Sequence, residues 1–397
     1  MGLAIVLNEF FLFYACMLAD DAISLHAKLR GKIGIEPRIE LTKDNLKLLY
    51  TPGAAFACQA VAKNKDLVFE YTSRWNNVAI VTDGTRVLGL GRIGPEAALP
   101  LMEGKALIFK ALGGVNAFPL CLNTKSVDEI VSVIKAVAPS FGGINLEDIS
   151  SPECFEVEER LTGLGIPVFH DDQHGTAIVA LAALENALKV VGKDKADSSV
   201  VILGAGAAGI GMAKLFSGFK DIVLLDSEGA LYAGRNCMNR FKEKIAKKTN
   251  KTKKKGSLSD VISGADVLIT VSGKANCLDV NVVKEMAEKP IVFALTNPVP
   301  EFDVLQAEKL GALVAAGSNF KNQVNNSLAF PGVFRGALDA RAKEITLEMN
   351  LTAAKAISSL VKNPSRDNIV PLTTDSRLLK EVSEAVKKTA LAGVQLK

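Results

Sequence analysis

The stretch SSVVILGAGAAGIGMAKLF, residues 198–216, decides the fold. Its apolar, β-branched start is typical of a buried strand, and its end is typical of a helix. Between them, Gly204, Gly206 and Gly209 stand in GxGxxG spacing, which allows a tight turn and a close approach of the backbone to a pyrophosphate. The amides at the start of the helix then favour negative charge. The stretch therefore predicts a Rossmann-type dinucleotide site.

The next predicted strand ends at Asp226, where a carboxylate can accept hydrogen bonds from a ribose diol. Because the first basic residue after it is Arg235, the pattern favours NAD, while lysines farther along leave NADP open. A glycine-rich turn without a ligand is the alternative. The residues expected to contact the dinucleotide are Gly204, Ala205, Gly206, Ala207, Ala208, Gly209 and Asp226.

Short apolar runs alternate with helical patterns from about residue 78 onward, which is typical of parallel α/β sheets. SVDE at residues 126–129 is a capping box that opens a helix running to Val137. Gly175 to Val191 is a longer, Ala-rich helix that we expect to be buried between two sheets. The predicted strands are Val78–Thr82, Phe118–Leu122, Gly142–Leu146, Pro167–Phe169, Ser199–Leu203, Asp221–Leu225, Asp266–Val271, Ile291–Leu295 and Ala312–Ala316.

The composition is that of a packed protein, with 48% hydrophobic and 23% charged residues over 397 residues. These values exclude disordered, collagen-like and coiled-coil chains. The six cysteines form no CxxC pair, which argues against zinc, iron–sulfur and redox motifs and favours a reducing, cytoplasmic location. The net charge is +4, yet residues 242–255 hold eight lysines. We interpret this run as a solvated helix end and loop, with no nucleic-acid partner.

The N-terminus is apolar from Leu3 to Ala19, interrupted only by Asn8 and Glu9. The run is short for a membrane span, which needs about 20 residues, so no membrane span is expected. A targeting segment and a translation start at Met17 are both open alternatives. Residues 1–25 therefore form an apolar N-terminal extension of uncertain status.

Two acidic pairs follow predicted strands: Glu147 with Asp148, and Asp171 with Asp172. Because the carboxyl ends of parallel strands build ligand sites, the four side chains are expected to cluster. Clustered carboxylate oxygens suit Mg²⁺ or Mn²⁺. A zinc site made by the spaced pair His170 and His174 is the weaker alternative, because HExxH is absent.

Longer motifs resemble the malic enzyme family in its short form, in order and over nearly the whole chain from about His26 to Lys397. The resemblance implies two α/β domains, an N-terminal substrate and metal domain at 26–172 and a C-terminal Rossmann NAD(P)-binding domain with terminal helices at 173–397. The motifs are LYTPGAA at 49–55, VTDGTRVLGLGRIGPEAALPLMEGKALIFKALGGVNAFPLCL at 81–122, FGGINLEDISSP at 141–152, PVFHDDQHGTA at 167–177, FALTNPVPE at 293–301 and NQVNNSLAFPGVFRGALD at 322–339.

The resemblance also implies residue roles. Tyr50 would be the general acid and Lys105 the general base, with Asp171 supporting the lysine. Arg86 would hold a malate carboxylate. The remaining implied contacts are Glu147, Asp148 and Asp172 to the divalent metal, and Asn297 and Asn326 to substrate or nicotinamide.

The implied function is oxidative decarboxylation of L-malate to pyruvate and CO₂ with NAD(P)⁺, by a homodimer or higher homo-oligomer. A malolactic reaction that retains NAD, and a non-catalytic nucleotide-binding role, are the alternatives. Three departures from the family pattern stand out: AAFA before Cys58, Trp75 in SRWNN, and Arg92 in GLGRIG. Arg92 puts a cation in a glycine-rich loop expected near the site, and the other two are expected at the pocket mouth or a subunit contact.

Overall fold

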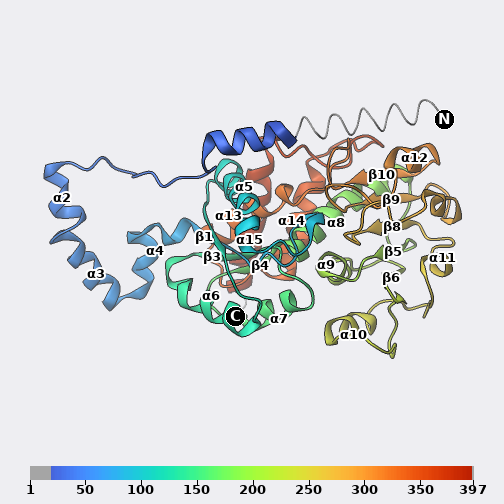
Figure 1. Cartoon of the computed structure of the whole chain (residues 1–397), viewed down its shortest axis with the longest axis horizontal. Helices are drawn as coiled ribbons and strands as arrows, with labels where there is room; N and C mark the ends of the chain where they lie inside the picture. Colours follow the sequence, from blue (N-terminus) through green and yellow to red (C-terminus); the bar gives the residue numbers. More distant parts are fainter. Residues whose placement is uncertain (1–18, 396–397) are drawn as a thin grey trace.

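The computed structural model describes residues 19–395 and contains two sheets (Figure 1). The first has the order β2-β1-β3-β4 and is parallel throughout. The second has the order β10-β9-β8-β5-β6-β7 and is parallel except where β7 pairs with β6. The strands are β1 (Asn77–Thr82), β2 (Asn116–Cys121), β3 (Gly143–Leu146), β4 (Val168–His170), β5 (Ser199–Leu203), β6 (Asp221–Asp226), β7 (Gly229–Ala230), β8 (Val267–Thr270), β9 (Ile291–Ala294) and β10 (Leu313–Ala316).

The predicted α/β architecture with a Rossmann sheet is confirmed. Every strand predicted from the sequence is present, with its ends shifted by at most two residues. The strand that the sequence did not predict is β7, a two-residue strand too short to leave an apolar run. The carboxyl ends of β3 and β4, which carry the two acidic pairs, lie side by side because Leu146 pairs with His170.

Helices cover both sheets, and residues 19–29 are also helical. Most of the predicted N-terminal extension lies outside the described residues. The helices are α2 (Lys43–Leu49), α3 (Gly53–Lys63), α4 (Val68–Tyr71), α5 (Pro95–Gly113), α6 (Val127–Val137), α7 (Glu153–Arg160), α8 (Asp171–Val191), α9 (Ala207–Leu215), α10 (Arg240–Ala246), α11 (Leu258–Val261), α12 (Val304–Lys309), α13 (Phe330–Asp339), α14 (Leu347–Ser359) and α15 (Leu378–Gln395).

The helix α6 has the predicted bounds, but its capping box is incomplete. The Ser126 hydroxyl accepts a hydrogen bond from the Glu129 amide at 3.4 Å. The Glu129 carboxylate accepts instead from the Thr124 hydroxyl, so it does not return to the backbone of Ser126. A single cap is enough to begin the helix there.

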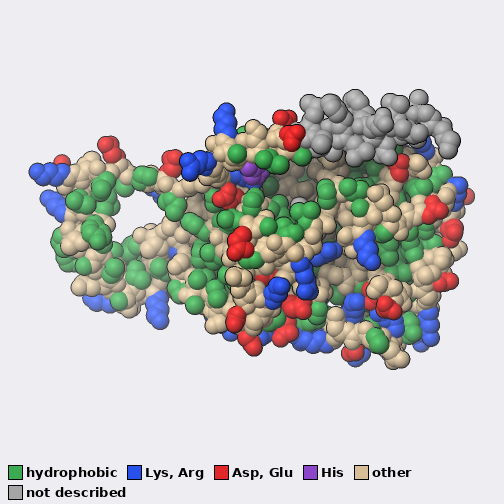
Figure 2. Space-filling view, in the orientation of Figure 1, with side chains coloured by type: hydrophobic (Ala, Val, Ile, Leu, Met, Phe, Trp, Pro, Cys, Tyr) green, Lys and Arg blue, Asp and Glu red, His purple; other side chains and the backbone are tan. Residues whose placement is uncertain are grey.

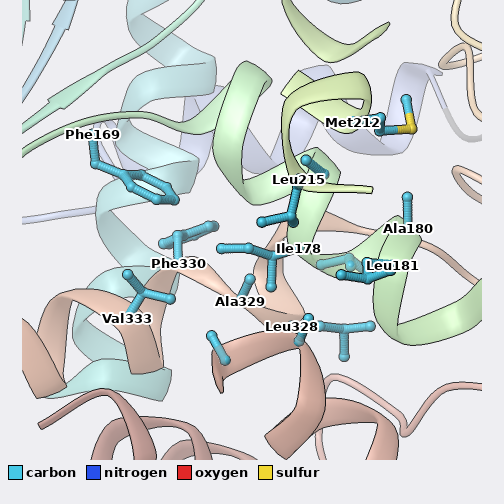
Figure 3. Packing of buried hydrophobic residues seen from close by; sticks show 14 of the residues in the cluster. Phe169, Ile178, Ala180, Leu181, Met212, Leu215, Leu328, Ala329, Phe330 and Val333 are labelled. Atoms are coloured by element: carbon cyan, nitrogen blue, oxygen red, sulfur yellow. The ribbon is translucent and has the colours of Figure 1, made fainter. Parts of the chain in front are cut away.

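The helix α8 is the central element of the core. It begins at Asp171, earlier than the Gly175 predicted from the sequence. Ile178 and Leu181 of α8 face Leu215 of α9 and Phe330 of α13 (Figure 3). In the described part of the chain, α8 is the one helix long and apolar enough to cross a membrane, and it is mostly buried inside the protein. It is therefore a core helix between the two sheets, as predicted.

Glycine brings α9 close to α8. A Cβ atom built on Gly211 would lie 2.2 Å from the carbonyl oxygen of Gln173, much closer than any real contact. The dinucleotide helix α9 is thus held against α8 at a distance that only glycine permits. Because Gln173 directly follows Asp172, the same contact joins the acidic site to the dinucleotide loop.

The helices α2 and α3 form an arm, residues 43–63, that projects from the body of the molecule (Figure 1). Neither helix contains a buried residue. The arm is nevertheless apolar, with Leu48 67% exposed and Phe56 68% exposed. Hydrophobic side chains cover much of the arm in the space-filling view (Figure 2). Apolar helices without a core on either side are typical of a surface that another chain covers.

We expect Gly211→Ala to lower the free energy of unfolding by about 1–3 kcal/mol, because overpacking forces the two helices apart. Gly393→Ala is the matched control, since Gly393 lies in α15 with nothing within 4 Å of its added Cβ atom. The control should be neutral or stabilising by up to about 1 kcal/mol. Denaturant unfolding measures both, and equal effects would contradict the proposed close packing.

Candidate active site

A cavity of about 600 Å³ opens between the two sheets. It runs from the acidic pairs of the first sheet to the glycine loop of the second. Ligand sites in open α/β sheets form at this end of the strands. Among the residues singled out in the sequence, those that line it are Arg86, Lys105, Glu147, Asp148, Asp171, Asp172, Gly206, Ala207, Ala208, Asn297 and Asn326.

Lys105 is buried at the acidic end of the cavity. The helix α5 presents its ammonium to Glu147 Oε2 at 2.6 Å and to Asp171 Oδ2, with which it forms a short ion pair. The ring of Phe330 lies beneath, with its centre 4.4 Å from Nζ. Burial alone would lower the pKa of Lys105, but the charges of Asp171 and Glu147 outweigh burial and raise it. In this arrangement Lys105 is protonated.

The four carboxylates share one small volume. Burial and repulsion from the neighbouring acids raise the pKa of Glu147 well above its ordinary value, against the attraction of Lys105. Burial likewise raises the pKa of Asp171. Asp172 is the exception, because His170 and Lys105 outweigh burial and lower its pKa. One ammonium therefore does not compensate the whole cluster.

The backbone after β3 joins the two acidic pairs. The amide of Asp148 donates to Asp172 Oδ2 at 2.9 Å, and His170 Nε2 lies 3.4 Å from the same oxygen. Asp148 itself has a φ of 52°, which a non-glycine residue adopts at a cost. No three acidic, histidine or cysteine side chains of residues 19–395 already converge as a metal-binding group. The acidic side chains lie near one another, but they do not converge on a common point as the ligands of a bound metal ion do.

The opposite wall carries polar side chains of both domains, with Asn297 and Asn326 from the second domain and Arg86 from the first. Asn326 donates to Asp171 Oδ2 at 3.1 Å and accepts from the Thr176 hydroxyl at 3.0 Å. The guanidinium of Arg86 reaches Gly273, where an added Cβ atom would lie 1.9 Å from Nη2. Asn297 places its side-chain oxygen in a buried position without a hydrogen-bond partner. These groups face the space that a substrate would fill.

The glycine loop has the geometry that a pyrophosphate requires. Gly204 has a φ of +123°, and a Cβ atom there would lie 2.5 Å from the carbonyl oxygen of Val271. A Cβ atom on Gly209 would lie 1.8 Å from the carbonyl oxygen of Gly204. Gly206 faces open space and begins α9 without a side-chain cap, which leaves the first amides of the helix available to an anion. Ala205 is buried beneath the loop.

Asp226 ends β6 as predicted, but its carboxylate is already bound. Arg235 Nη1 donates to Oδ1 at 2.8 Å, Arg235 Nη2 donates to Oδ2 at 2.5 Å, and Lys242 Nζ donates to Oδ2 at 2.6 Å. These bonds outweigh burial and lower the pKa of Asp226. The sequence shows no basic residue between Asp226 and Arg235, and the structure brings both Arg235 and Lys242 to this carboxylate.

Tyr50 is the one proposed catalytic residue that the structure does not bring to the cavity. It lies between α2 and α3 in the arm, 73% exposed, and is not among the lining residues. The arm carries it away from Lys105 within a single chain (Figure 1).

The other singled-out residues lie outside the main cavity. Arg92 lines a separate cavity of about 490 Å³ beside Asp83 and Lys125, rather than the predicted site. Trp75 packs under the guanidinium of Arg335, 5.3 Å from its ring centre. His174 Nε2 pairs with Glu158 Oε1 at 2.7 Å, and no zinc pair forms with His170 among the described residues.

The lysine run has a partly structural role. The interpretation as a helix end and loop holds, since α10 ends at Ala246. Lys242 instead pairs with Asp226, while Lys251 and Lys254 donate to backbone carbonyls. Because these contacts join residues that are distant in the sequence, the lysine run at residues 242–255 did not by itself predict them.

Sequence reasoning missed Gly273, Phe330 and Glu301. Glu301 is fully buried and accepts from the Ser272 amide at 2.8 Å and the Thr296 hydroxyl at 2.6 Å. It therefore ties together the loops that carry Gly273 and Asn297. Both loops directly follow predicted strands, Asp266–Val271 and Ile291–Leu295, and this position could have indicated from the sequence that they belong to the site.

Comparisons with known proteins show the family to which the chain belongs. The family model described as malic enzyme, N-terminal domain matches residues 33–162, and the one described as malic enzyme, NAD binding domain matches residues 173–392. A bifunctional malic/malolactic enzyme of Bacillus subtilis (strain 168) is 51% identical over 383 residues, which cover 94% of this chain and 93% of the relative. An NAD-dependent malic enzyme of Geobacillus stearothermophilus is 50% identical over 380 residues, which cover 94% and 79%.

A solved structure extends the agreement to the fold. The crystal structure of an NAD-dependent malic enzyme from Thermotoga maritima superposes with a TM-score of 0.88 at 45% identity, covering 92% of this chain and 98% of that one. The resemblance read from the motifs is thus confirmed by sequence and by structure. The chain belongs to the malic enzyme family.

Proposed function

We propose that this protein catalyses the divalent-metal-dependent oxidative decarboxylation of L-malate to pyruvate and CO₂, with reduction of NAD⁺ or NADP⁺. The observation that supports it best is the buried Lys105, held by Glu147 and Asp171 in the cavity that also reaches the glycine loop. A base beside clustered acids and a dinucleotide site is what hydride removal from a hydroxy acid requires. A cytoplasmic location remains a prediction from the sequence.

The donor set fits a divalent cation. Glu147, Asp148 and Asp171 are buried and Asp172 is partly exposed, and burial together with repulsion among the acids raises the pKa of Glu147. Carboxylate oxygens are the preferred ligands of Mg²⁺ and Mn²⁺, and Glu147, Asp148 and Asp172 would hold the ion. When bound, such an ion acidifies a coordinated hydroxyl and draws electrons away from the bond that loses CO₂.

Lys105 would take the proton of the C2 hydroxyl at Nζ. Its pKa must first fall, because Asp171 and Glu147 raise it in the arrangement described above. The carboxylates of Asp171 and Glu147 are the two negative charges that keep Lys105 protonated. If Glu147 ligates a metal ion, its charge is no longer available to Lys105, and the pKa of Lys105 falls. Asp171 would then orient the lysine alone, with Asn326 donating to the same carboxylate oxygen.

Arg86 would bind a carboxylate of malate through two parallel hydrogen bonds. Its guanidinium lies against Gly273 of the second domain, so it stands where substrate and dinucleotide meet. Asn297, whose side-chain oxygen is buried without a partner, lines the same region and would contact nicotinamide or substrate. Hydride would pass from C2 of malate to the nicotinamide across this region.

Protonation of the three-carbon product needs an acid, and the tyrosine implied for this step is not among the described residues that line the cavity of a single chain. We propose that Tyr50 of a second copy supplies it, in a homodimer or higher homo-oligomer. The arm that carries Tyr50 is apolar and has no core of its own. Leu107 of α5 lines the cavity and is exposed, and exposed Leu99 lies on the same helix, so α5 offers an apolar surface to a partner's arm.

A malolactic reaction is the second candidate, because the Bacillus subtilis relative is named a bifunctional malic/malolactic enzyme. The two reactions use the same binding groups and differ in whether the reduced cofactor is released. Quantifying pyruvate, lactate and free NAD(P)H separates them.

The purified protein should produce NAD(P)H and pyruvate in equal amounts from L-malate with Mn²⁺ or Mg²⁺, and a chelator should stop both. Asp172→Asn should weaken Mn²⁺ binding by about 10-fold or more, because it removes a charged ligand. Asp128→Asn, at an exposed surface ion pair, is the control. Chelator-resistant turnover would contradict the metal assignment, and lactate without free NAD(P)H would select the malolactic reaction.

Lys105→Ala should lower kcat by at least about 100-fold, because general-base catalysis contributes that much, and should also lower the melting temperature, because it leaves Glu147 and Asp171 without their buried cation. The matched control is Lys110→Ala, since Lys110 lies exposed on the same helix and bonds only to Asn116. Steady-state kinetics and thermal unfolding of both variants check this. Near-normal turnover of Lys105→Ala would remove the lysine from the mechanism.

Mixing two inactive variants tests the origin of the acid. In a dimer of Tyr50→Phe with Lys105→Ala chains, a tyrosine supplied by the partner leaves one site complete. Co-refolded mixtures should then recover roughly a quarter of the wild-type activity, because half of the dimers are mixed and each has one complete site. No recovery, with mixed dimers present by mass spectrometry, would place Tyr50 in the site of its own chain or outside the mechanism.

A further inference from the structure

Lys32 is a cation at the active-site cavity that the mechanism above does not use. It lines the cavity together with Arg86 and Lys105. The sequence did not indicate this position, because Lys32 lies far upstream of the first predicted strand, at residues 78–82. It belongs to residues 30–33, called here the strap, and the structure brings the strap to the site.

The strap begins with a sharp turn at the end of a helix. Residues 19–29 are helical, and the Arg30 amide donates to the carbonyl of His26 at 3.0 Å, which closes the last helical turn. Arg30 then has a φ of 52° and Gly31 a φ of 126°. Two successive residues with positive φ end the helix, and the second favours glycine. The turn leads the chain onto α5, over which the helix of residues 19–29 lies (Figure 1).

Two hydrogen bonds hold Lys32 on α5. Its backbone amide donates to Glu103 Oε2 at 3.0 Å, and its Nζ donates to the carbonyl oxygen of Pro100 at 2.7 Å. A Cβ atom built on Gly104 would lie 3.7 Å from Nζ, so the ammonium lies over a residue that has no side chain. Gly104 directly precedes Lys105, and the strap therefore places a second ammonium next to the residue before the proposed base.

The ammonium of Lys32 has no acidic partner. It forms no ion pair within residues 19–395, since the Glu103 carboxylate bonds to the backbone amide instead. Lys105, by contrast, is paired with two buried carboxylates. Of the three cations among the described residues that line the cavity, Lys32 and Arg86 are thus the two available to a substrate. A dicarboxylate has two charged ends, and each can bind one cation.

The two available cations belong to different parts of the cavity. Arg86 lies against Gly273 of the second domain, where substrate and nicotinamide would meet. Carbon C2 of malate would give up its hydride there, so the C1 carboxylate, which is bonded to C2, would lie on the side of Arg86. Lys32 lies on α5 of the first domain. The C4 carboxylate, one carbon farther from C2, is the end of malate that can extend to it.

We propose that Lys32 is a substrate-binding residue that pairs with the C4 carboxylate of L-malate, while Arg86 holds the C1 carboxylate. This inference rests on the proposed function, because it takes malate as the substrate. The C4 carboxylate loses its charge as CO₂ departs. The ion pair with Lys32 is therefore stronger in bound malate than in the transition state of decarboxylation, and it acts on KM rather than on kcat.

Binding of L-malate and L-lactate tests the proposal, because lactate is the same hydroxy acid without the C4 carboxylate. Calorimetry with Mg²⁺ and NADH measures binding without turnover, since NADH cannot accept a hydride. Lys32→Gln should weaken L-malate binding by about tenfold, because a charge-assisted hydrogen bond is lost, and should change L-lactate binding by less than about twofold. Equal losses for the two ligands, or an unchanged affinity for L-malate, would overturn the proposal.

Two further variants separate the charge of Lys32 from its place in the structure. Lys32→Arg keeps the charge and should retain most of the affinity for L-malate, whereas a loss as large as that of Lys32→Gln would contradict an ion pair with the substrate. Lys28→Gln is the control, because Lys28 is exposed on the helix before the strap. It should leave the affinity for both ligands unchanged, and an effect equal to that of Lys32→Gln would show that only the general surface charge matters.

Steady-state kinetics provide an independent measurement. Lys32→Gln should raise the KM for L-malate by about tenfold and leave kcat unchanged or higher, because the lost contact is made mainly in the bound substrate. A lower kcat at an unchanged KM would place Lys32 in the chemical step and reject its role in binding the C4 carboxylate.

The two proposals can fail separately. A preference for L-malate over L-lactate that depends on Lys32, without production of NAD(P)H or lactate, would reject the reaction and keep the substrate contact. Normal turnover with an unchanged KM for L-malate in Lys32→Gln would reject the contact and keep the reaction.

Discussion

The clustering of four carboxylates, three of them buried, beside the one buried ammonium of Lys105 is the constraint on which the rest of the structure depends. Charges of one sign are not buried together without a compensating group. Lys105 offsets part of the repulsion, and its place on α5 requires that helix to pack against both the first sheet and α13. The uneven pKa values of Glu147, Asp171 and Asp172 follow from how the few neighbouring cations and amides are shared among them.

Much of the fold could be predicted because its strands are continuous apolar runs. Both faces of a parallel sheet are covered, so strands such as β5 and β8 are apolar along their whole length and are easily recognised. The sequence pattern predicted the start of α8 too late, at Gly175, because the first turn of the helix, from Asp171 to His174, is polar and carries site residues. Asp171 and Asp172 of this turn line the cavity, while Gln173 and His174 bond to Glu158, so the turn shows no apolar helical pattern.

Site residues that directly follow predicted strands could be identified from the sequence. Ion-pair partners that come from other parts of the chain could not. Glu147 and Asp172 were found because two strand ends bring their loops together. The ion pairs of Asp226 could not be read from the chain, since Arg235 and Lys242 reach it only after the β6–β7 turn and α10 have folded. Tyr50 was identified by its motif alone, and the motif did not indicate that Tyr50 would lie exposed in an arm whose two helices contain no buried residue.

The position of α8 has a consequence for how the protein unfolds. One continuous hydrophobic cluster includes Ile80 of the first sheet, Ile178 of α8 and Ile202 of the second sheet. Neither half can lose its structure without exposing the apolar faces of the helix that both share. A second cluster, which includes Val201, Leu268 and Val292, belongs to the second half alone. Because the larger cluster is nevertheless shared, we regard the two halves, although they match separate family models, as a single cooperative unit with one melting transition.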